Sequence, residues 1–320
     1  MNYKPIILVA GEPNSVFFEI FLKSIEKNIK TPLILIASYN LLKLQMIKLG
    51  FKKKINKINF KNIENYKLDN KKINLIDVKF DQKKSFEKIS SKSNSYINKS
   101  FNLAFDLINK GYSNKLINGP VSKKFFLKNK YLGVTELISK KYNLKKNAML
   151  IYNKKLSVCP VTTHLPLKLV KKNISKFLIQ DKVILINNFF KNKIGFLPRI
   201  GVLGLNPHCE SISKFNEENK IIKPAIQSLK KLKINVSGPI PADTAFLKKN
   251  RDKFDVIIGM YHDQVLTPIK TLYEYDAVNI TVGLPFLRIS PDHGPNEKMM
   301  GKNISNPLSL IRALQFMDKN

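Results

Sequence analysis

Short apolar runs alternate with segments of helical periodicity along most of the chain, and this order restricts the possible folds more than any other feature. Residues 5–10 are apolar, and residues 17–25 then place Phe, Leu and Ile at the spacing of one helical face. Helical patterns separate most of the further strand-like runs, which occur at residues 33–36, 115–118, 148–152, 156–161, 200–205 and 256–260. Because parallel strands need crossover helices, this alternation predicts an α/β protein with mostly parallel sheets.

Composition excludes several other classes of protein. Hydrophobic residues make up 43% of the 320 positions, which is enough for a sizeable core, and the length fits about two domains at ~100–200 residues each. No apolar run approaches the ~18 residues of a membrane-spanning helix. Two cysteines are too few for a disulfide framework. We therefore expect a cytoplasmic globular protein.

The charge of the chain is strongly basic, with 56 Lys and Arg against 23 Asp and Glu and a formal net charge of +33. Such an excess raises the question of nucleic-acid binding. Only four of the basic residues are Arg, however, and the lysines are spread over the whole chain. Base-edge recognition favours the guanidinium fork of Arg. The lysines therefore indicate a solvated basic surface that can attract a small anionic substrate, with nucleic-acid binding as a minor alternative.

Three of the four histidines follow strand-like runs directly. His164, His208 and His262 are separated by 44 and 54 positions, so they form no local metal-binding motif. The carboxyl ends of parallel strands converge on one edge of a sheet, which could assemble these imidazoles around Zn²⁺ or another divalent ion. Asp263 could orient His262 as a ligand. The alternative is that each histidine only caps its own loop.

Sequence fingerprints for nucleotide binding are absent, because the chain contains neither G-x-G-x-x-G nor G-x-x-x-x-G-K-[ST]. The spacing of residues alone therefore does not indicate NAD. Lys270, Asn279 and Arg288 carry groups that could recognise a phosphate or carboxylate.

A series of short motifs along nearly the whole chain resembles the 4-hydroxythreonine-4-phosphate dehydrogenase family. The stretch from residue 238 to residue 294 is its most specific part. The motifs, in order, are Gly11-Glu-Pro13, Gly119-Pro-Val121 with Lys123, Gly133-x-Thr-Glu136, Thr162-Thr-His-Leu-Pro-Leu167, Gly204-Leu-Asn-Pro-His208, Gly238-Pro-Ile-Pro-Ala-Asp-Thr244, Met260-Tyr-His-Asp-Gln264, Val278-Asn-Ile-Thr281, Gly283-Leu-Pro-Phe286 with Arg288, and Asp292-His-Gly294.

The resemblance implies two α/β/α lobes of the isocitrate and isopropylmalate dehydrogenase type, with the active site in the cleft between them. We expect residues 1–125 plus 275–320 in the first lobe and residues 126–274, with the histidines, in the second. This fold type binds NAD without the usual fingerprint. The resemblance further implies a homodimer in which both subunits contribute metal ligands at the interface.

The activity implied is the oxidation of 4-phosphooxy-L-threonine to 2-amino-3-oxo-4-phosphooxybutanoate, which decarboxylates to 3-amino-2-oxopropyl phosphate in vitamin B6 (pyridoxal phosphate) biosynthesis. It would need NAD or NADP and one divalent ion per site (Zn²⁺, Mg²⁺ or Co²⁺). The family's residues correspond here to His164, His208 and His262 as metal ligands and to Thr135, Lys270, Asn279 and Arg288 as substrate contacts. Asp243 and Asp263 are candidates for the proton acceptor, and the cofactor contacts are unassigned.

Three departures from the family pattern keep alternatives open. Val134 stands where the family usually has His, residues 14–18 replace a Gly-rich turn, and residues 295–301 differ from the usual T-A-x-D-x-A-G. The loss of a polar group at Val134 could alter which substrate fits, and it keeps a related substrate, such as threonate or erythronate 4-phosphate, open as the first alternative. The second is a basic nucleic-acid-binding protein that has kept the fold without the activity.

Overall fold

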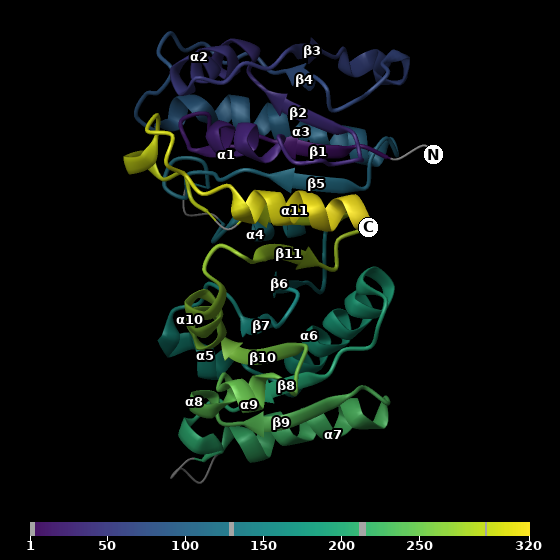
Figure 1. Cartoon of the computed structure of the whole chain (residues 1–320). Coiled ribbons are helices and arrows are strands. Elements are labelled where there is room, and N and C mark those ends of the chain that lie inside the picture. The colour runs from purple at the N-terminus through teal and green to yellow at the C-terminus, as the bar shows by residue number, and fades with distance from the viewer. Residues whose placement is uncertain (1–3, 128–130, 211–215, 292) are drawn as a thin grey trace. The chain divides into compact units, whose positions relative to one another are not determined.

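The computed structural model describes residues 4–127, 131–210, 216–291 and 293–320. The chain divides into two compact units (Figure 1). The first consists of Met1–Lys141 and Pro285–Asn320, and the second, Tyr142–Leu284, is inserted between these two segments. The lobe boundaries proposed from the sequence remain a prediction.

The first unit is built on six strands, all of whose neighbouring pairs are parallel. In spatial order they are β3 (Ile55–Lys57), β4 (Ile73–Asp77), β2 (Leu33–Ala37), β1 (Ile6–Val9), β5 (Lys115–Asn118) and β12 (Leu287–Pro291). The central β1 is completely buried, which explains its uninterrupted apolar sequence. The predicted strands at residues 5–10, 33–36 and 115–118 are thereby confirmed.

Helices connect these strands and cover the sheet. They are α1 (Phe17–Ser24), α2 (Tyr39–Leu49), α3 (Asn94–Asn109), α4 (Val134–Lys141) and α11 (Leu308–Lys319), with short 3₁₀ segments η1 (Phe60–Asn65), η2 (Ser91–Ser93) and η6 (Glu297–Met299). Local sequence explains the bounds of α2. The Ser38 hydroxyl accepts a hydrogen bond from the Leu41 amide at its start, and Gly50 ends it in the left-handed conformation with φ of 76°.

The second unit contains a mixed sheet. In spatial order its strands are β11 (Val278–Val282), β6 (Ala148–Tyr152), β7 (Ser157–Thr162), β10 (Val256–Tyr261), β8 (Ile200–Leu203) and β9 (Val236–Ile240). β6 runs antiparallel to both of its neighbours, whereas the strands from β7 to β9 are parallel to one another. The carboxyl ends of β7, β10 and β8 therefore lie at one edge of the sheet.

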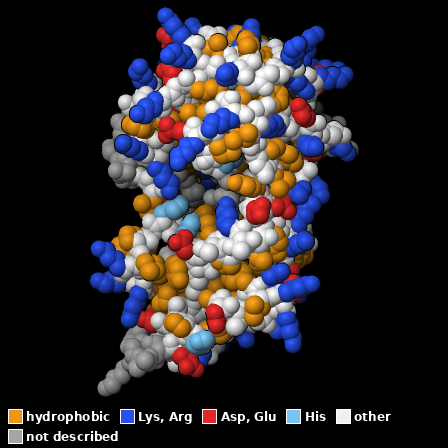
Figure 2. Space-filling view, turned by 60° about the vertical axis from the view of Figure 1, so that its left-hand side comes forward, with side chains coloured by type: hydrophobic (Ala, Val, Ile, Leu, Met, Phe, Trp, Pro, Cys, Tyr) orange, Lys and Arg blue, Asp and Glu red, His pale blue; other side chains and the backbone are white. Residues whose placement is uncertain are grey.

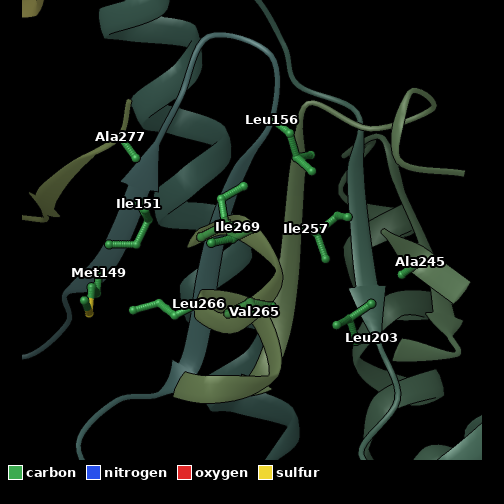
Figure 3. Packing of buried hydrophobic residues seen from close by; sticks show 11 residues of the cluster. Met149, Ile151, Leu156, Leu203, Ala245, Ile257, Val265, Leu266, Ile269 and Ala277 are labelled. Atoms are coloured by element: carbon green, nitrogen blue, oxygen red, sulfur yellow. The ribbon is translucent and has the colours of Figure 1, made fainter. Parts of the chain in front are cut away.

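The helices of the second unit are α5 (Leu167–Asn173), α6 (Lys176–Phe189), α7 (Lys223–Lys231), α8 (Ala242–Ala245), α9 (Lys248–Arg251) and α10 (His262–Tyr273), with shorter segments η3 (Phe190–Ile194), η4 (Pro207–Cys209) and η5 (Glu218–Ile222). α10 buries Val265, Leu266 and Ile269 in a cluster with Ile151 of β6 and Ile257 of β10 (Figure 3). This packing fixes the start of α10 directly after β10.

The predicted α/β class with mostly parallel strands is confirmed. No helix in the described ranges has both the length and the apolar character needed to cross a lipid bilayer. Figure 2 shows the Lys and Arg side chains scattered over the visible face, as their even distribution along the sequence predicted.

Candidate active site

Two of the candidate histidines lie side by side at the carboxyl ends of neighbouring strands. Thr162 ends β7 and pairs with Tyr261 at the end of the parallel strand β10. The Thr162 hydroxyl also donates a hydrogen bond of 2.8 Å to the Met260 carbonyl oxygen, which ties the two strand ends together. As a result, the ring centroids of His164 and His262 are 5.7 Å apart.

Asp263 contacts the ring of His262 directly. Its Oδ1 atom lies 2.6 Å from Nδ1 of His262. With the proton on Nδ1 facing this carboxylate, Nε2 keeps its lone pair for another partner. The His262 side chain is 32% exposed and the Asp263 side chain 79% exposed, so the pair is open to solvent. A neutral imidazole backed by a carboxylate is the usual arrangement of a metal-ligating histidine.

His208 lies on a separate loop after β8. Its Nδ1 atom is 3.7 Å from Oδ2 of Asp243, and its side chain is 76% exposed. The φ angle of 53° puts His208 in the left-handed region, which is uncommon for a residue with a side chain.

Glu218 holds the loop that leads to His208. One carboxylate oxygen accepts 2.8 Å hydrogen bonds from the amides of Leu205 and Asn206. Burial of Glu218 opposes its ionisation, but the hydrogen bonds from Asn206 and Leu205 outweigh this effect and lower its pKa. A charged acceptor therefore stabilises the strained turn.

Within the described residues of a single chain, no three His, Cys, Asp or Glu side chains come together in a group that could hold a metal ion. The structure therefore brings His164 and His262 together and leaves His208 apart from a complete ligand set. The paired histidines supply two of the three imidazoles expected from the sequence.

Arg288 is a buried cation in the first unit. It lies on β12, is 2% exposed, and its Nε donates a 2.8 Å hydrogen bond to Oδ1 of Asn118 at the end of β5. Its Nη1 donates a 2.9 Å bond to the hydroxyl of Thr135 on α4. Burial lowers the pKa of Arg288 to about 10, partly opposed by Glu136, so the guanidinium is charged at neutral pH. Buried charges in proteins are paired with an opposite charge or serve a function, and the nearby Glu136 favours the charged form of Arg288.

Lys270 and Asn279 are the two candidate substrate contacts in the second unit. Lys270, on α10, is half-buried, and this burial lowers its pKa. Asn279 lies on β11, and its buried Oδ1 has no hydrogen-bond partner among the residues that the structure describes. A buried acceptor without a donor is rare in folded proteins and is a natural contact for a ligand.

Two further residues, at the end of β5 and after the end of β1 in the first unit, were not assigned a role from the sequence. Asn118 positions Arg288, although it was visible only as the residue before the Gly119-Pro120 turn. Glu12, after β1, is 1% exposed and accepts hydrogen bonds from the Ser93 hydroxyl at 2.9 Å and the Asn14 amide at 3.2 Å. Burial raises the pKa of Glu12 to about 7, against the effect of these bonds. The sequence placed Glu12 in the motif Gly11-Glu-Pro13 directly after an apolar run, but gave the carboxylate no role of its own.

Known proteins resemble this chain over most of its length. The family model for "Pyridoxal phosphate biosynthetic protein PdxA" matches residues 28–317. A 4-hydroxythreonine-4-phosphate dehydrogenase of Sulfurihydrogenibium sp. is 41% identical over 249 residues, which are 76% of this chain and 75% of the relative. A D-threonate 4-phosphate dehydrogenase of Pectobacterium atrosepticum is 38% identical over 188 residues, which cover 58% of this chain and 57% of that protein.

Solved structures agree with these sequence matches. The crystal structure of 4-hydroxythreonine-4-phosphate dehydrogenase from Klebsiella pneumoniae has a TM-score of 0.85, 26% identity and complete coverage of both chains. An isocitrate dehydrogenase from Methylococcus capsulatus has a TM-score of 0.52 at 9% identity, covering 98% of this chain and 84% of its own, and therefore shows a shared fold alone. The chain belongs to the family of the pyridoxal phosphate biosynthetic protein PdxA and is a dehydrogenase of that family.

Proposed function

We propose that the chain catalyses the metal-dependent, NAD- or NADP-linked oxidation of 4-phosphooxy-L-threonine to 2-amino-3-oxo-4-phosphooxybutanoate. This β-keto acid would lose carbon dioxide to give 3-amino-2-oxopropyl phosphate, a precursor in vitamin B6 biosynthesis. The observation that carries the proposal is the pair of adjacent imidazoles, His164 and His262, backed by Asp263 in a chain of this dehydrogenase family.

The chemistry of the donor groups fits a divalent ion. His262 presents Nε2 because its Nδ1 faces Asp263, and His164 lies beside it. A bound divalent ion would supply positive charge next to the substrate alcohol, which favours loss of its proton. His208 would complete the ligand set from a second copy of the chain, since the family resemblance implies that both subunits of a homodimer contribute ligands.

Charged and polar side chains would hold the substrate. Arg288 and Lys270 carry the positive charge that a phosphate and a carboxylate need, and the guanidinium of Arg288 is already oriented by Asn118 and Thr135. The unpartnered Oδ1 of Asn279 could accept a hydrogen bond from the substrate amine or hydroxyl. These contacts would fix the carbon that loses its hydride relative to the nicotinamide.

Two carboxylates are the candidate proton acceptors. The contact between Asp263 and His262 favours a positioning role for Asp263. Asp243 contacts His208 and is half-exposed, which leaves it accessible to a substrate proton or to water.

A second candidate function has the same chemistry and a different substrate. Val134 begins α4 directly before Thr135, which contacts Arg288, and it offers no polar group where the family usually has His. This replacement keeps open, as the alternative substrate, a phosphorylated hydroxy acid that lacks the amine, such as D-threonate or erythronate 4-phosphate.

One assay tests both candidates. Purified protein would be mixed with NAD⁺ or NADP⁺, a divalent ion and each of the three phosphorylated substrates, and the absorbance of the reduced nucleotide would be followed. We expect the fastest turnover with 4-phosphooxy-L-threonine, its loss on addition of a chelator, and its return with metal. Turnover only with a hydroxy-acid phosphate would establish the second candidate.

The metal role is tested with a variant in the loop after β8. His208→Ala should lower the bound metal and turnover while its circular dichroism spectrum stays unchanged. Cys209→Ser, at the adjacent position, is the matched control and should retain both. Full turnover in a metal-free His208→Ala protein would disprove the metal mechanism.

We further propose that the protein acts in the cytoplasm as a homodimer. Light scattering during gel filtration would measure its mass, and a monomer that turns over substrate at full rate would contradict the dimeric site.

A further inference from the structure

A cavity of about 340 Å³ lies in the first unit beside the turn that follows β1. Asn14 lines it from this turn, and the other lining residues belong to the segment of residues 80–93, between β4 and α3. The volume falls at the lower end of the ~300–1,000 Å³ typical of small-molecule sites.

Buried amide groups hold this cavity in shape. The side chains of Asn14 and Gln82 form two reciprocal hydrogen bonds, of 2.9 and 3.0 Å. Asn14 Oδ1 also accepts from the Glu87 amide at 2.8 Å, and Gln82 Nε2 donates to the Lys84 carbonyl oxygen at 2.8 Å. Asn14 is 3% exposed and Gln82 9%. These bonds fasten the 80–93 segment to the β1 turn, so the cavity exists before any ligand arrives.

The charge around the cavity is mainly positive. Four exposed lysines line it, Lys83, Lys84, Lys88 and Lys92, against the two carboxylates of Asp81 and Glu87. The 16-residue helix α3 begins directly after this segment and carries no acidic residue in its first turn, so its positive end adds to the same potential. A ligand with more than one negative charge is the best match.

The position of the cavity in the sheet indicates the kind of anion. In the sheet, β2 and β4 lie on one side of β1 and β5 lies on the other. The chain runs from β4 through α3 to β5. The direction in which strands are added therefore reverses at β1, and the cavity lies beyond the carboxyl end of this strand. In open α/β sheets, nucleotides bind at such a reversal.

We propose that this cavity binds the phosphate groups of the pyridine nucleotide, an inference that rests on the proposed NAD- or NADP-linked activity. In a Gly-rich turn, backbone amides approach the pyrophosphate closely. Here Val16, Phe17 and Phe18 bring buried side chains to the end of the β1 turn. Lysine ammonium groups from the segment of residues 80–93 would supply the positive charge instead. Because lysine side chains are long and flexible, they can reach the phosphates without a close approach of the backbone.

The test compares two double variants with the same loss of charge. Lys83→Gln/Lys88→Gln removes two lysines of the cavity, and Lys52→Gln/Lys53→Gln removes two that line a different cavity of the first unit. Binding of NADH and of ADP would be measured by calorimetry without substrate, at fixed ionic strength. We expect at least tenfold weaker binding of both ligands in the first variant and less than twofold change in the second.

Because Lys52, Lys83 and Lys88 are exposed and Lys53 is partly exposed, both variants should fold, which thermal unfolding would verify. Equal affinities for NADH in the two variants would overturn the proposal. So would a selective loss of affinity for 4-phosphooxy-L-threonine, which would assign the cavity to the substrate. Weaker NADH and ADP binding in the first variant would support it even if the wild-type protein failed to oxidise 4-phosphooxy-L-threonine, because that failure would concern the proposed function alone.

Discussion

The first unit buries Arg288 and Glu12 at its strand ends, whereas the second leaves its His262–Asp263 pair partly in solvent, although it buries Glu218, which holds the loop after β8. Arg288 is 2% exposed and hydrogen bonded to two neutral side chains, and Glu12 is 1% exposed. In the second unit the His262 side chain is 32% exposed and that of Asp263 79%. Folding alone orients the buried groups. The exposed groups are held by few protein contacts, so a bound ion would have to complete their arrangement.

The largest expected effect comes from removing the buried guanidinium. Arg288→Ala leaves Oδ1 of Asn118 and the hydroxyl of Thr135 without this donor, at a cost of about 1–3 kcal/mol for each lost bond. We expect a matching decrease in the free energy of unfolding in urea, together with loss of turnover. Arg312→Ala is the control, because Arg312 bonds Gln315 on its own helix. Equal destabilisation by the two variants would remove the contrast between the buried Arg288 and the partly exposed Arg312.

A smaller effect, dependent on pH, is expected at Glu12. Its pKa of about 7 lies above its ordinary value, so the folded chain keeps a proton that the unfolded chain has already released. Stability should therefore decrease as the pH rises from about 4.5 to 8, by about 3 kcal/mol from this group. Glu12→Gln should lack this decrease. Urea unfolding of both proteins at pH 5 and pH 8 gives the difference, and parallel pH dependences would show that Glu12 is not protonated in the folded state.

In the second unit, removal of the carboxylate beside His262 should affect the affinity for the divalent ion rather than the stability of the fold. Asp263→Asn removes the carboxylate from Nδ1 of His262, and we expect the affinity for the divalent ion to fall about 10–100-fold. Because Asp263 is exposed, the unfolding free energy should change by less than about 0.5 kcal/mol. Competition with a chromogenic chelator measures the affinity. A large loss of stability with unchanged metal binding would show that Asp263 stabilises the fold and does not position His262 as a metal ligand.

The smallest effect is expected for a surface ion pair of the second unit. Arg199 Nη2 and Asp255 Oδ1 are 2.9 Å apart, with side chains 49% and 23% exposed. Solvent screens such a pair, so Asp255→Asn should cost less than about 1 kcal/mol in urea unfolding. A loss as large as that of Arg288→Ala would show that exposure does not determine how much these charges contribute.

Strands buried on both faces were the easiest to predict from the sequence. β1 and β2 are continuous apolar segments, and β5 was predicted from Leu116 and Ile117 before the Gly119-Pro120 turn. β3 and β4 were not identified, because residues 51–100 contain many lysines and the buried residues of β4, Ile73 to Ile76, form only a short run. In a segment so rich in lysine, a strand of three to five residues cannot be distinguished by sequence from an exposed segment.

The candidate site was predictable to the extent that each residue follows a strand. His164 and His262 could be expected together because parallel strands end at one edge, and the structure places them together. The contacts of Arg288 with Asn118 and Thr135 were not foreseen, since these residues are 170 and 153 positions away in the chain. That pairing depends on β12 lying beside β5, and β12 itself was not recognised as a strand.

The insertion of the second unit into the first has a consequence for synthesis of the chain on the ribosome. Asn118 and Arg288 are 170 positions apart, and at about 5–20 residues per second the ribosome needs roughly 10–30 s to pass from one to the other. During this interval the nascent first unit lacks β12, so β5 is an open edge that can pair with other strands. The whole second unit emerges meanwhile. The arginine that completes the first unit is therefore among the last functional residues to be made.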